Sequence, residues 1–537
     1  MNINFDKIKE IKTNILNSMP FNKKPEKERQ CTTEMEKRDN DSIEDKKVDD
    51  ETFFILTYMA ALATGDVDRK SLFYYTSQQT QYKISRYFDT AHILASKWGH
   101  EYSEAFRLIA KRIKTKRLEE LFGRLSGALI SGEPEKEFLK TELESRKTIY
   151  DNEYETSLEG LKKWTDGYSA LLVSIALIIT IILISTMIYQ VGNIYQLSMM
   201  TLLMTFLICG IGIAFLYDSS PYETKTHDLK TQPKERIMAN ILKKTLLPLM
   251  VLIDAILIYI NASWGYILII SAICMAPIGI LGLLNDKKID KRDENFSTFI
   301  KTLGSIAGTM GVTTAAALEE LDKDNVDTLK PLVESLHASM TLGIDPNACW
   351  DKFVGKSGSE LINRCVHIFT DGIELGGNPS EMGEIVSGTS LAIVLHRSKR
   401  KLISSGFTGL VAALHTVMAG LMIFIIEIMK IFANLVEDMT DHGLTDTSQS
   451  MNGMGATNSA ITSGMCMFSI GEKIPFLYNF TTAATIILTL GNGIAIKVVE
   501  GGDNNKIFLY EAILAFVVGL EILLVPVIVS HVFTFDI

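Results

Sequence analysis

The chain has 537 residues, of which 47% are hydrophobic and 22% are charged, and its formal net charge is −10 at pH 7. The apolar residues gather in long runs, which excludes an ordinary soluble enzyme, and the acidic balance favours no nucleic-acid partner. The six cysteines include no Cys-x-x-Cys pair and the nine histidines no His-x-x-x-His pair. We therefore expect no disulfide framework, no metal site and no cofactor.

Residues 1–50 form the first region of the chain. They hold Lys, Glu and Asp in near balance with almost no aromatic residues, so they cannot bury enough apolar surface to fold alone. No apolar run of 7 to 15 residues follows the first lysines, so the region is no signal peptide. We predict a disordered cytoplasmic tail.

Residues 51–167 are patterned as charged helices and predict an all-helical module on the aqueous side, here called the first module. A basic run interrupts the pattern between Lys111 and Arg117. This run is either a solvated helix face or a docking surface for an acidic partner. The side chains that would make the docking surface are Lys111, Arg112, Lys114, Lys116 and Arg117.

Beyond the first module, apolar segments become long enough to cross a hydrocarbon core of about 30 Å at about 1.5 Å per residue. Four of them lie within residues 168–284, around a basic link at 217–245, and three lie within 406–537, around an acidic loop at 435–473. The seven predicted spans are 168–189, 194–216, 246–263, 266–284, 406–434, 474–496 and 508–533.

The distribution of lysine and arginine predicts the orientation of these spans, because short cytoplasmic loops hold the positive charge. The basic link and the cluster just before residue 406 are rich in both residues, whereas the loop at 435–473 is acidic. We therefore expect a cytoplasmic N-terminus and an extracellular C-terminus. Topology and attraction to anionic lipid would explain the cluster of Arg397, Lys399, Arg400 and Lys401.

Residues 285–405, the second module, repeat the pattern of the first module. Three pairs of anchors match at separations of 244 to 246 positions: Gly65 with Gly311, Trp98-Gly99 with Leu342-Gly343, and Ser126-Gly127 with Asp371-Gly372. The opening helix of the second copy has an amphipathic face, whereas that of the first, 52–64, has a poorer phase. We therefore expect the two modules to make different contacts.

A doubled helical module of this kind, each copy ending in Gly-x-x-x-Gly-Gly/Glu-x-Pro or a close variant and leading into membrane spans, resembles the type II secretion F-domain family over roughly residues 50–535. The resemblance implies an all-α, polytopic, non-enzymatic membrane platform, most similar to those of the archaellum, the archaeal swimming filament. Such platforms bind a cytoplasmic hexameric secretion-type ATPase, help to assemble and turn a filament of pilin-like archaellins, and form homodimers. Alternatively, the chain would be the platform of a related adhesive type IV pilus or of a secretion system.

The resemblance also suggests roles for single residues. The basic run from Lys111 to Arg117 is about fifty residues from the nearest predicted span, where lipid is a weaker explanation, so we assign it to the ATPase contact. The resemblance further implies close helix or dimer packing through small residues, which are Gly304, Gly308, Gly372 and Gly376.

Three ionisable residues lie near the middle of predicted spans: Asp254, His415 and Glu521. Such groups normally face the interior of a helix bundle or a cavity. They indicate either interhelical hydrogen bonds or a proton-coupled transporter, and a transporter would concentrate its internal repeat in the membrane. A phosphate-binding loop is also missing, because the run Gly65 to Ser71 lacks the glycine before its lysine, so we expect no ATP hydrolysis by this chain.

Overall fold

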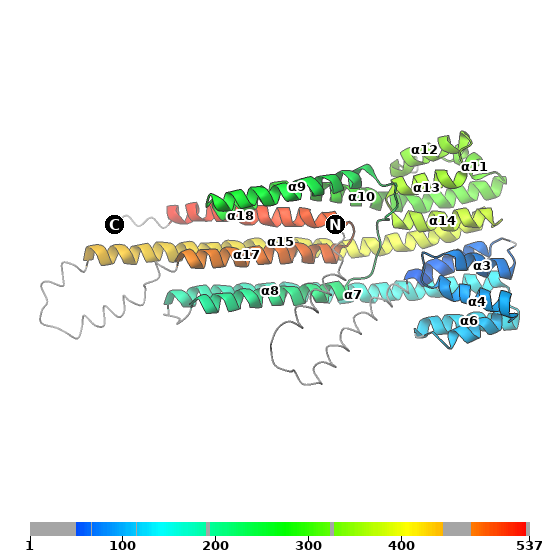
Figure 1. The fold of residues 1–537 in the computed structure, drawn as a ribbon, viewed down its shortest axis with the longest axis horizontal. Helices are drawn as coiled ribbons and strands as arrows, with labels where there is room; N and C mark the ends of the chain where they lie inside the picture. The colour runs from blue at the N-terminus through cyan, green and yellow to red at the C-terminus, as the bar shows by residue number, and fades with distance from the viewer. Residues whose placement is uncertain are drawn as a thin grey trace. The chain divides into compact units, whose positions relative to one another are not determined.

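The computed structural model describes residues 50–65, 67–113, 115–188, 194–322, 327–443 and 474–532, and these residues contain helices and no β-strand (Figure 1). Six helices in this part of the chain are long and apolar enough to cross a membrane. The prediction of an all-α polytopic membrane protein is therefore confirmed. The predicted tail before residue 50, most of the predicted acidic loop and the last five residues lie outside the described ranges.

Three helices are long enough to run from a module into the group of apolar helices, here called the membrane part. They are α7, α10 and α15, with 54, 47 and 65 residues. A helix spanning 50–62 precedes the labelled helices. In chain order these are α3 (Arg69–Gln78), α4 (Ser85–Trp98), α5 (Tyr102–Ala110), α6 (Lys116–Ser131), α7 (Glu135–Ile188), α8 (Ile194–Ser219), α9 (Lys234–Tyr259), α10 (Trp264–Met310), α11 (Thr314–Glu320), α12 (Lys330–Thr341), α13 (Pro346–Ser357), α14 (Glu360–Glu374), α15 (Pro379–Gly443), α17 (Ile474–Glu500) and α18 (Ile507–Val532).

The predicted span at 246–263 falls in α9, which is not among the six candidate spans. Any 18-residue stretch of α9 contains at least three charged residues, and its apolar part after Lys244 is only about 22 Å long. α9 nevertheless runs antiparallel to α10, because Glu235 bonds Lys288 (2.5 Å) and Asp254 bonds Ser271 (3.0 Å). α9 therefore leads the chain from the basic link to the far end of the membrane part, where α10 begins.

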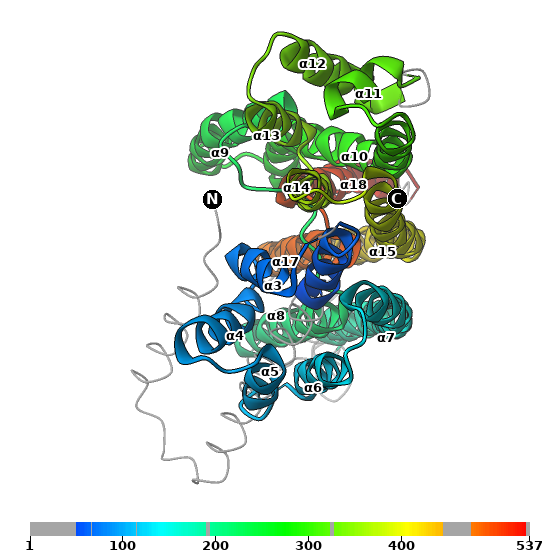
Figure 2. The same ribbon diagram turned by 90° about the vertical axis from the view of Figure 1, so that its right-hand side faces the viewer.

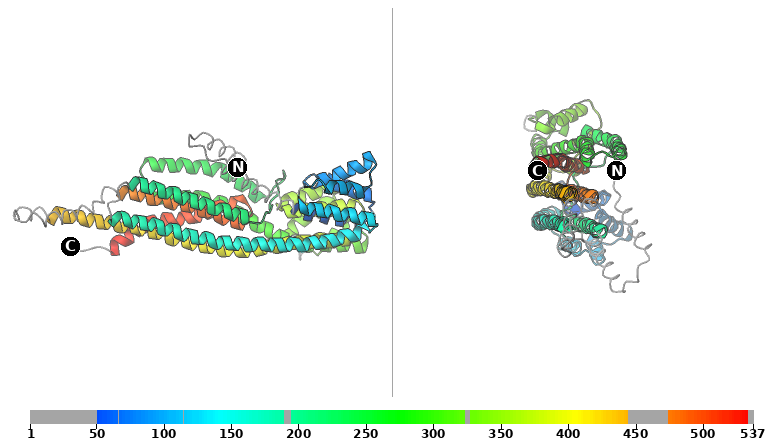
Figure 3. Two further views of the ribbon diagram at one scale, coloured as in Figure 1. Left: turned by 90° about the horizontal axis from the view of Figure 1, so that it is seen from below. Right: turned by 90° about the vertical axis from the view of Figure 1, so that its left-hand side faces the viewer.

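The two modules have the same order of helices. α3, α4, α5, α6 and α7 of the first correspond to α11, α12, α13, α14 and α15 of the second, with starts 244 or 245 positions apart. α7 and α15 run side by side in the same direction (Figure 3). Equivalent positions on them touch: Lys136 pairs with Glu381 (2.7 Å) and Asp151 with His396 (2.6 Å). α7 and α15 are therefore aligned in register along their lengths.

The opening helices of the two modules are packed differently. Every residue of the helix 50–62 is buried, and the helix lies between the modules (dark blue in Figure 2). Its Phe53 ring stacks on Tyr150 of α7 (5.0 Å), and its Thr57 hydroxyl lies 3.2 Å from that of Thr389 on α15. A helix covered on all sides needs no polar face, which explains its poor amphipathic phase.

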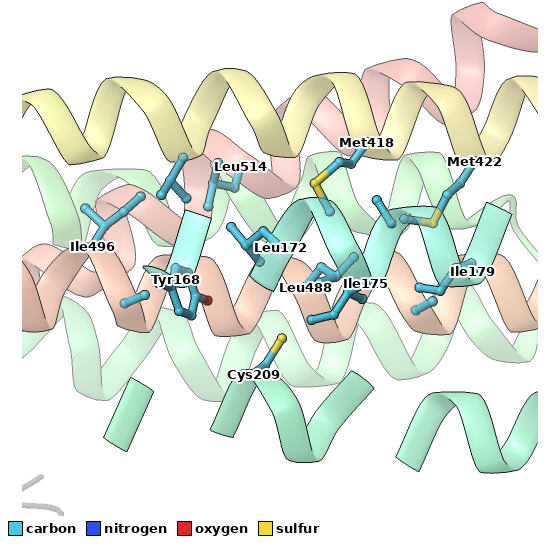
Figure 4. Packing of buried hydrophobic residues seen from close by; sticks show 14 of the residues in the cluster. Tyr168, Leu172, Ile175, Ile179, Cys209, Met418, Met422, Leu488, Ile496 and Leu514 are labelled. Atoms are coloured by element: carbon cyan, nitrogen blue, oxygen red, sulfur yellow. The ribbon is translucent and has the colours of Figure 1, made fainter. Parts of the chain in front are cut away.

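The membrane part has an apolar core shared by α7, α8, α15 and α17 (Figure 4). On α7 the core residues recur every three or four positions, as a single buried helix face requires. They meet methionines of α15, aliphatic residues of α17 and a cysteine of α8. The side chains labelled in Figure 4 from these helices are Tyr168, Leu172, Ile175, Ile179, Cys209, Met418, Met422, Leu488 and Ile496.

Candidate functional site

Charged residues from four segments meet where the second module joins the membrane helices. The segments are the link between α8 and α9, the middle of α10, the middle of α15 and the turn between α17 and α18. We call this set the ionic junction. It encloses a small cavity lined by Glu223, Lys225, Asp286, Asp290, Asp293, Glu294, Arg397, Arg400, Lys401, Glu500 and Lys506, among others.

The link between α8 and α9 is folded onto the second module. The backbone N–H of Glu360 donates to the Lys225 carbonyl (3.0 Å), and an isolated β-bridge joins Thr226 to Ser359. The buried His227 ring lies 3.1 Å from the Val354 carbonyl, and burial lowers the pKa of its imidazole. These contacts hold the link in place and thereby position Glu223 and Lys225 in the junction.

Arg397 and Arg400 project from α15, one helical turn apart. The Arg397 guanidinium pairs with Glu223 and with Asp293 of α10. The Arg400 guanidinium donates to the Val499 carbonyl at the end of α17 (3.0 Å), to the Pro221 carbonyl and to the Ser220 hydroxyl. These two arginines therefore join α15 to α10, to the link and to the end of α17.

This location differs from the lipid-facing role expected of the basic cluster. Arg397 and Arg400 point into the protein because carboxylates and carbonyls there satisfy their hydrogen bonds. Lys399 and Lys401 remain exposed, where Lys399 pairs with Glu155 and Lys401 lies 3.6 Å from Asp290. Only the two lysines are therefore available to lipid headgroups.

Two lysines complete the junction. Lys506 is 1% exposed and lies 2.8 Å from Asp286 and 2.6 Å from Glu500. Lys225 lies 3.0 Å from Asp286 and 2.5 Å from Asp290. Burial alone would lower the pKa of the Lys225 ammonium, but these two aspartates raise it above its usual value.

The Glu223 carboxylate is held in its charged form by the same pairing. Burial alone would raise the pKa of the Glu223 carboxyl, but Arg397, Arg400 and Lys225 hold it below its usual value. Removal of one partner from such a buried pair costs about 3 to 5 kcal/mol, because it strands the other charge. The junction therefore resists separation of the helices that it joins.

A glycine pair makes the turn of the junction possible. Gly501 and Gly502 both have φ of +74°, a conformation that other residues rarely adopt. A Cβ at Gly501 would lie 2.8 Å from the Arg400 guanidinium carbon, and one at Gly502 would lie 2.7 Å from an Asp286 oxygen. The turn therefore needs glycine for its backbone and for close approach of both charged groups.

The junction is built of charge pairs that join four segments of the chain. Within the described ranges, no group of three or more His, Cys, Asp or Glu side chains could hold a metal ion. The aspartates of the junction were missed in the sequence, although a signal was present. Asp286, Asp290 and Asp293 recur at helical spacing directly after the apolar part of α10, where lysines would be expected at a cytoplasmic membrane surface.

The predicted basic run lies at the turn between α5 and α6. Lys111, Arg112, Lys116 and Arg117 are exposed, and Lys114 lies outside the described residues. Arg117 pairs with Glu153 of α7 (2.7 Å). Glu153 is fifteen residues, about 22 Å, from the predicted start of the span at residue 168, so the fold brings the run much nearer to the membrane part than its sequence separation suggests.

Three of the four glycines expected in helix or dimer packing make close contacts inside one chain, and the fourth lies at a turn. A Cβ on Gly304 would lie 2.4 Å from the Pro379 carbonyl oxygen, and one on Gly308 2.8 Å from Ser380 Cβ. These two glycines let α10 approach α15. Gly372 packs on a methionine of α15, and Gly376 forms a turn with φ of +80°.

The ionisable residues of the predicted spans face other helices. His415 is 1% exposed; its ring accepts from Asn492 Nδ2 (3.0 Å) and lies 3.2 Å from the Thr489 hydroxyl. Asp254 accepts from the Ser271 hydroxyl (3.0 Å). For both residues the contacts are the interhelical hydrogen bonds that were the alternative to a transport role.

The third intramembrane residue, Glu521, lies beside Gly420 of α15, and its Oε2 is buried without a hydrogen-bond partner among the described residues. A fourth, Glu511, was not singled out in the sequence because it lies near the start of its predicted span. It is 5% exposed and packs against Gly493 of α17. α18 thus presents two carboxyl groups to its neighbours.

Comparison with known proteins identifies two relatives. The chain is 24% identical over 501 residues to a protein named Flagella accessory protein J from Methanocaldococcus jannaschii, a match covering 90% of this chain and 85% of that protein. It is 22% identical over 375 residues to the protein of the same name from Methanococcus voltae, covering 66% of each. No protein-family model matches the chain. No solved structure matches it.

Proposed function

We propose, from its homology with the two proteins named Flagella accessory protein J, that this chain is a non-enzymatic membrane platform that assembles the archaellum. The observation that carries the proposal is the continuity of α7, α10 and α15. Each runs from a module into an apolar segment long enough to cross a membrane. A platform needs such continuity, because movement of a module then reaches the membrane without passing through a loop.

In this proposal a cytoplasmic hexameric secretion-type ATPase acts on the modules. Its movements pass along α7 and α15 and through the ionic junction into the membrane helices. There, pilin-like archaellins enter the growing filament, and the same movements turn it. The buried charge pairs support this route, since they bind the second module to α10, α15 and the α17–α18 turn together.

We further propose that the N-terminus and both modules are cytoplasmic and that the C-terminus is extracellular. Seven crossings, counting α9 beside α10, would place the two ends on opposite sides, and Lys230, Lys234 and Lys244 remain exposed in the basic link. A cysteine probe within 443–464 should be labelled in intact cells, whereas one within 320–330 should not. Protection of the first probe would reject this orientation.

A homodimer is also part of the proposal. Gly304, Gly308 and Gly372 are occupied by contacts inside the chain and Gly376 forms a turn, so the dimer contact is assigned to other surfaces. The mass of the detergent-solubilised protein, measured by light scattering, should correspond to two copies of the chain. A mass corresponding to one copy would reject the homodimer.

Deletion of the gene tests the platform directly. A deletion strain should lack filaments and fail to swim, and the wild-type gene should restore both. An Arg397→Met variant should remain in the membrane yet fail to restore swimming, because Glu223 and Asp293 lose their shared partner. Lys399→Met, which breaks an exposed pair in the same helix, should restore swimming.

Two results would change the proposal. Normal filaments and swimming in the deletion strain would reject it. Loss of surface attachment with swimming intact would point instead to the platform of an adhesive pilus. If Arg397→Met is absent from the membrane fraction, Arg397→Lys keeps the charge and separates loss of coupling from loss of the protein.

A further inference from the structure

One end of both modules lies far from the membrane helices. α7 and α15 begin there, at Glu135 and Pro379, and α10 ends there (Figure 1). Glu135 is 33 residues from the predicted span at 168–189, a distance of about 50 Å along α7. We call this end the module tip. Lipid cannot cover side chains at such a distance.

The turns α4–α5 and α12–α13 both lie at the module tip. In the first module, Ser126 Oγ donates to the Ser103 carbonyl (2.7 Å), which sets the start of α5 beside the end of α6. In the second, Asn347 donates to Glu374 (2.8 Å), which sets the start of α13 beside the end of α14. Because α6 and α14 lead into α7 and α15, both turns reach the same end of the molecule.

Each turn exposes a large apolar side chain at the equivalent position of the repeat. Trp98 is 73% exposed and Leu342 is 80% exposed. Each precedes a glycine in the left-handed region, Gly99 (φ +75°) or Gly343 (φ +74°), which ends the helix and leaves the side chain protruding. Three further exposed apolar residues belong to the module tip: Ile130, Met310 and Ile344.

An exposed group of large apolar residues on an aqueous surface marks an interaction site. The charges beside it are mainly acidic. Within four positions of Trp98 or Leu342 in the sequence, the exposed charged residues are Glu101, Asp345 and Lys97. A complementary partner would therefore present apolar pockets edged by basic side chains.

We propose that the module tip docks a soluble partner with two equivalent apolar pockets, one for Trp98 and one for Leu342. The equivalence follows from the repeat, in which Trp98 and Leu342 occupy matching positions of the two modules, and a partner can match it by offering two copies of the same subunit. This inference rests on the proposed function in one respect: the partner with repeated subunits is the ATPase ring.

The module tip replaces the basic run as the main contact in this proposal. Arg117 pairs with Glu153, eighteen residues after the start of α7, which places the run about 27 Å from the module tip. Tryptophan is also among the residues that dominate binding energy at interfaces, whereas exposed lysines contribute little. The two surfaces are far enough apart to be tested separately.

The test measures binding of the purified ATPase to the full-length protein in lipid nanodiscs. Trp98→Ser and Leu342→Ser should each weaken binding by about tenfold or more, and the double variant should weaken it further. Trp98→Phe should retain most of the binding. Ile149→Ser, which removes an exposed apolar side chain from α7 outside the module tip, is the matched control and should bind as wild type does.

A second variant separates the two surfaces. Reversal of the basic run, with Lys111, Arg112, Lys114, Lys116 and Arg117 changed to Glu, should leave the affinity within about threefold of wild type. The proposal would be rejected if the Trp98 and Leu342 variants bound the ATPase with wild-type affinity while this reversal variant lost binding. The ATPase contact would then be assigned to the basic run. If the wild-type chain did not bind the ATPase, the ATPase would be rejected as a partner in the proposed function. It would then also be rejected as the partner that docks at the module tip.

Discussion

The two modules share one order of helices, yet they are attached to the rest of the protein in different ways. The second module is continuous with the membrane part at both ends, through α10 and α15, and the ionic junction ties it there. Within the described residues, the first is continuous with it only through α7. Its opening helix, 50–62, is buried between the modules and bonded to α14 and α15 of the second module.

This difference shows how a repeated sequence pattern can have two structural roles. The helix 50–62 is the first element described, and it fills the space between the modules. Its counterpart in α10 is fixed in direction by the apolar segment before it. The second module is therefore the better placed of the two to transmit movement to the membrane helices.

The largest effect on this comparison is expected from Arg364 of α14, which holds the helix 50–62. Its guanidinium pairs with Asp50 (2.7 Å) and stacks over the Phe54 ring (4.5 Å). Arg364→Met should lower the free energy of unfolding by about 3 to 5 kcal/mol, because it strands the buried Asp50. Thermal unfolding in detergent and protease cleavage after residue 50 would measure the loss.

The control for Arg364 is Arg69, whose pair with Glu135 is exposed to water. Arg69→Met should change the free energy of unfolding by at most about 1 kcal/mol. Equal effects of the two substitutions would show that the pair between Asp50 and Arg364 of the second module does not stabilise the helix 50–62.

A smaller effect is expected where α10 packs on α15. A methyl group on Gly304 would lie 2.4 Å from the Pro379 carbonyl oxygen, whereas one on Gly388 of α15 would meet no atom within 4 Å. Gly304→Ala should therefore destabilise the protein by about 1 to 3 kcal/mol. Gly388→Ala should stabilise it by about 0.5 to 1 kcal/mol, because alanine suits a helix interior better than glycine.

Unfolding temperatures of the two glycine variants would decide this point. The position equivalent to Gly304 in the first module is Met59, 245 residues earlier, in a helix with different neighbours. A stabilising effect of Gly304→Ala would show that α10 and α15 are less closely packed than described, and would remove one contrast between the modules.

The smallest effect concerns pH and Asp371 of α14, which accepts hydrogen bonds from Tyr58 (3.2 Å) and Gln79 (3.0 Å) of the first module. Burial raises the pKa of this carboxyl above its usual value of 3.8. The folded state therefore binds the proton more tightly than the unfolded state. Its contribution to stability is greatest below about pH 3.8 and falls as the pH rises through the folded pKa.

Asp371→Asn keeps an acceptor oxygen for both donors but cannot ionise. Relative to wild type, this variant should be more stable at pH 7 than at pH 4, as measured by unfolding temperature. Glu374→Gln, at an exposed position one turn later, should show no such dependence. An equal shift of the Asn variant at both pH values would exclude Asp371 as a titrating contact between the modules.

Local patterns in the sequence were sufficient to predict the class of fold and its repeat. Apolar runs define most of the spans, and helical periodicity with matching glycines defines the second copy, because both properties involve residues close together in the chain. α9 is the exception, since its charges shorten the apolar run and its place beside α10 depends on the pairs Glu235–Lys288 and Asp254–Ser271.

Only the tertiary structure decided which charged residues act together. Arg397 reads in the sequence as one member of a basic cluster, whereas its partner Glu223 is 174 positions away and Asp293 is 104 positions away. The same holds for Trp98 and Leu342, whose exposure at one end of the molecule depends on how α5, α6 and their counterparts fold back. Pairings over such separations depend on how whole helices pack, and no local periodicity records them.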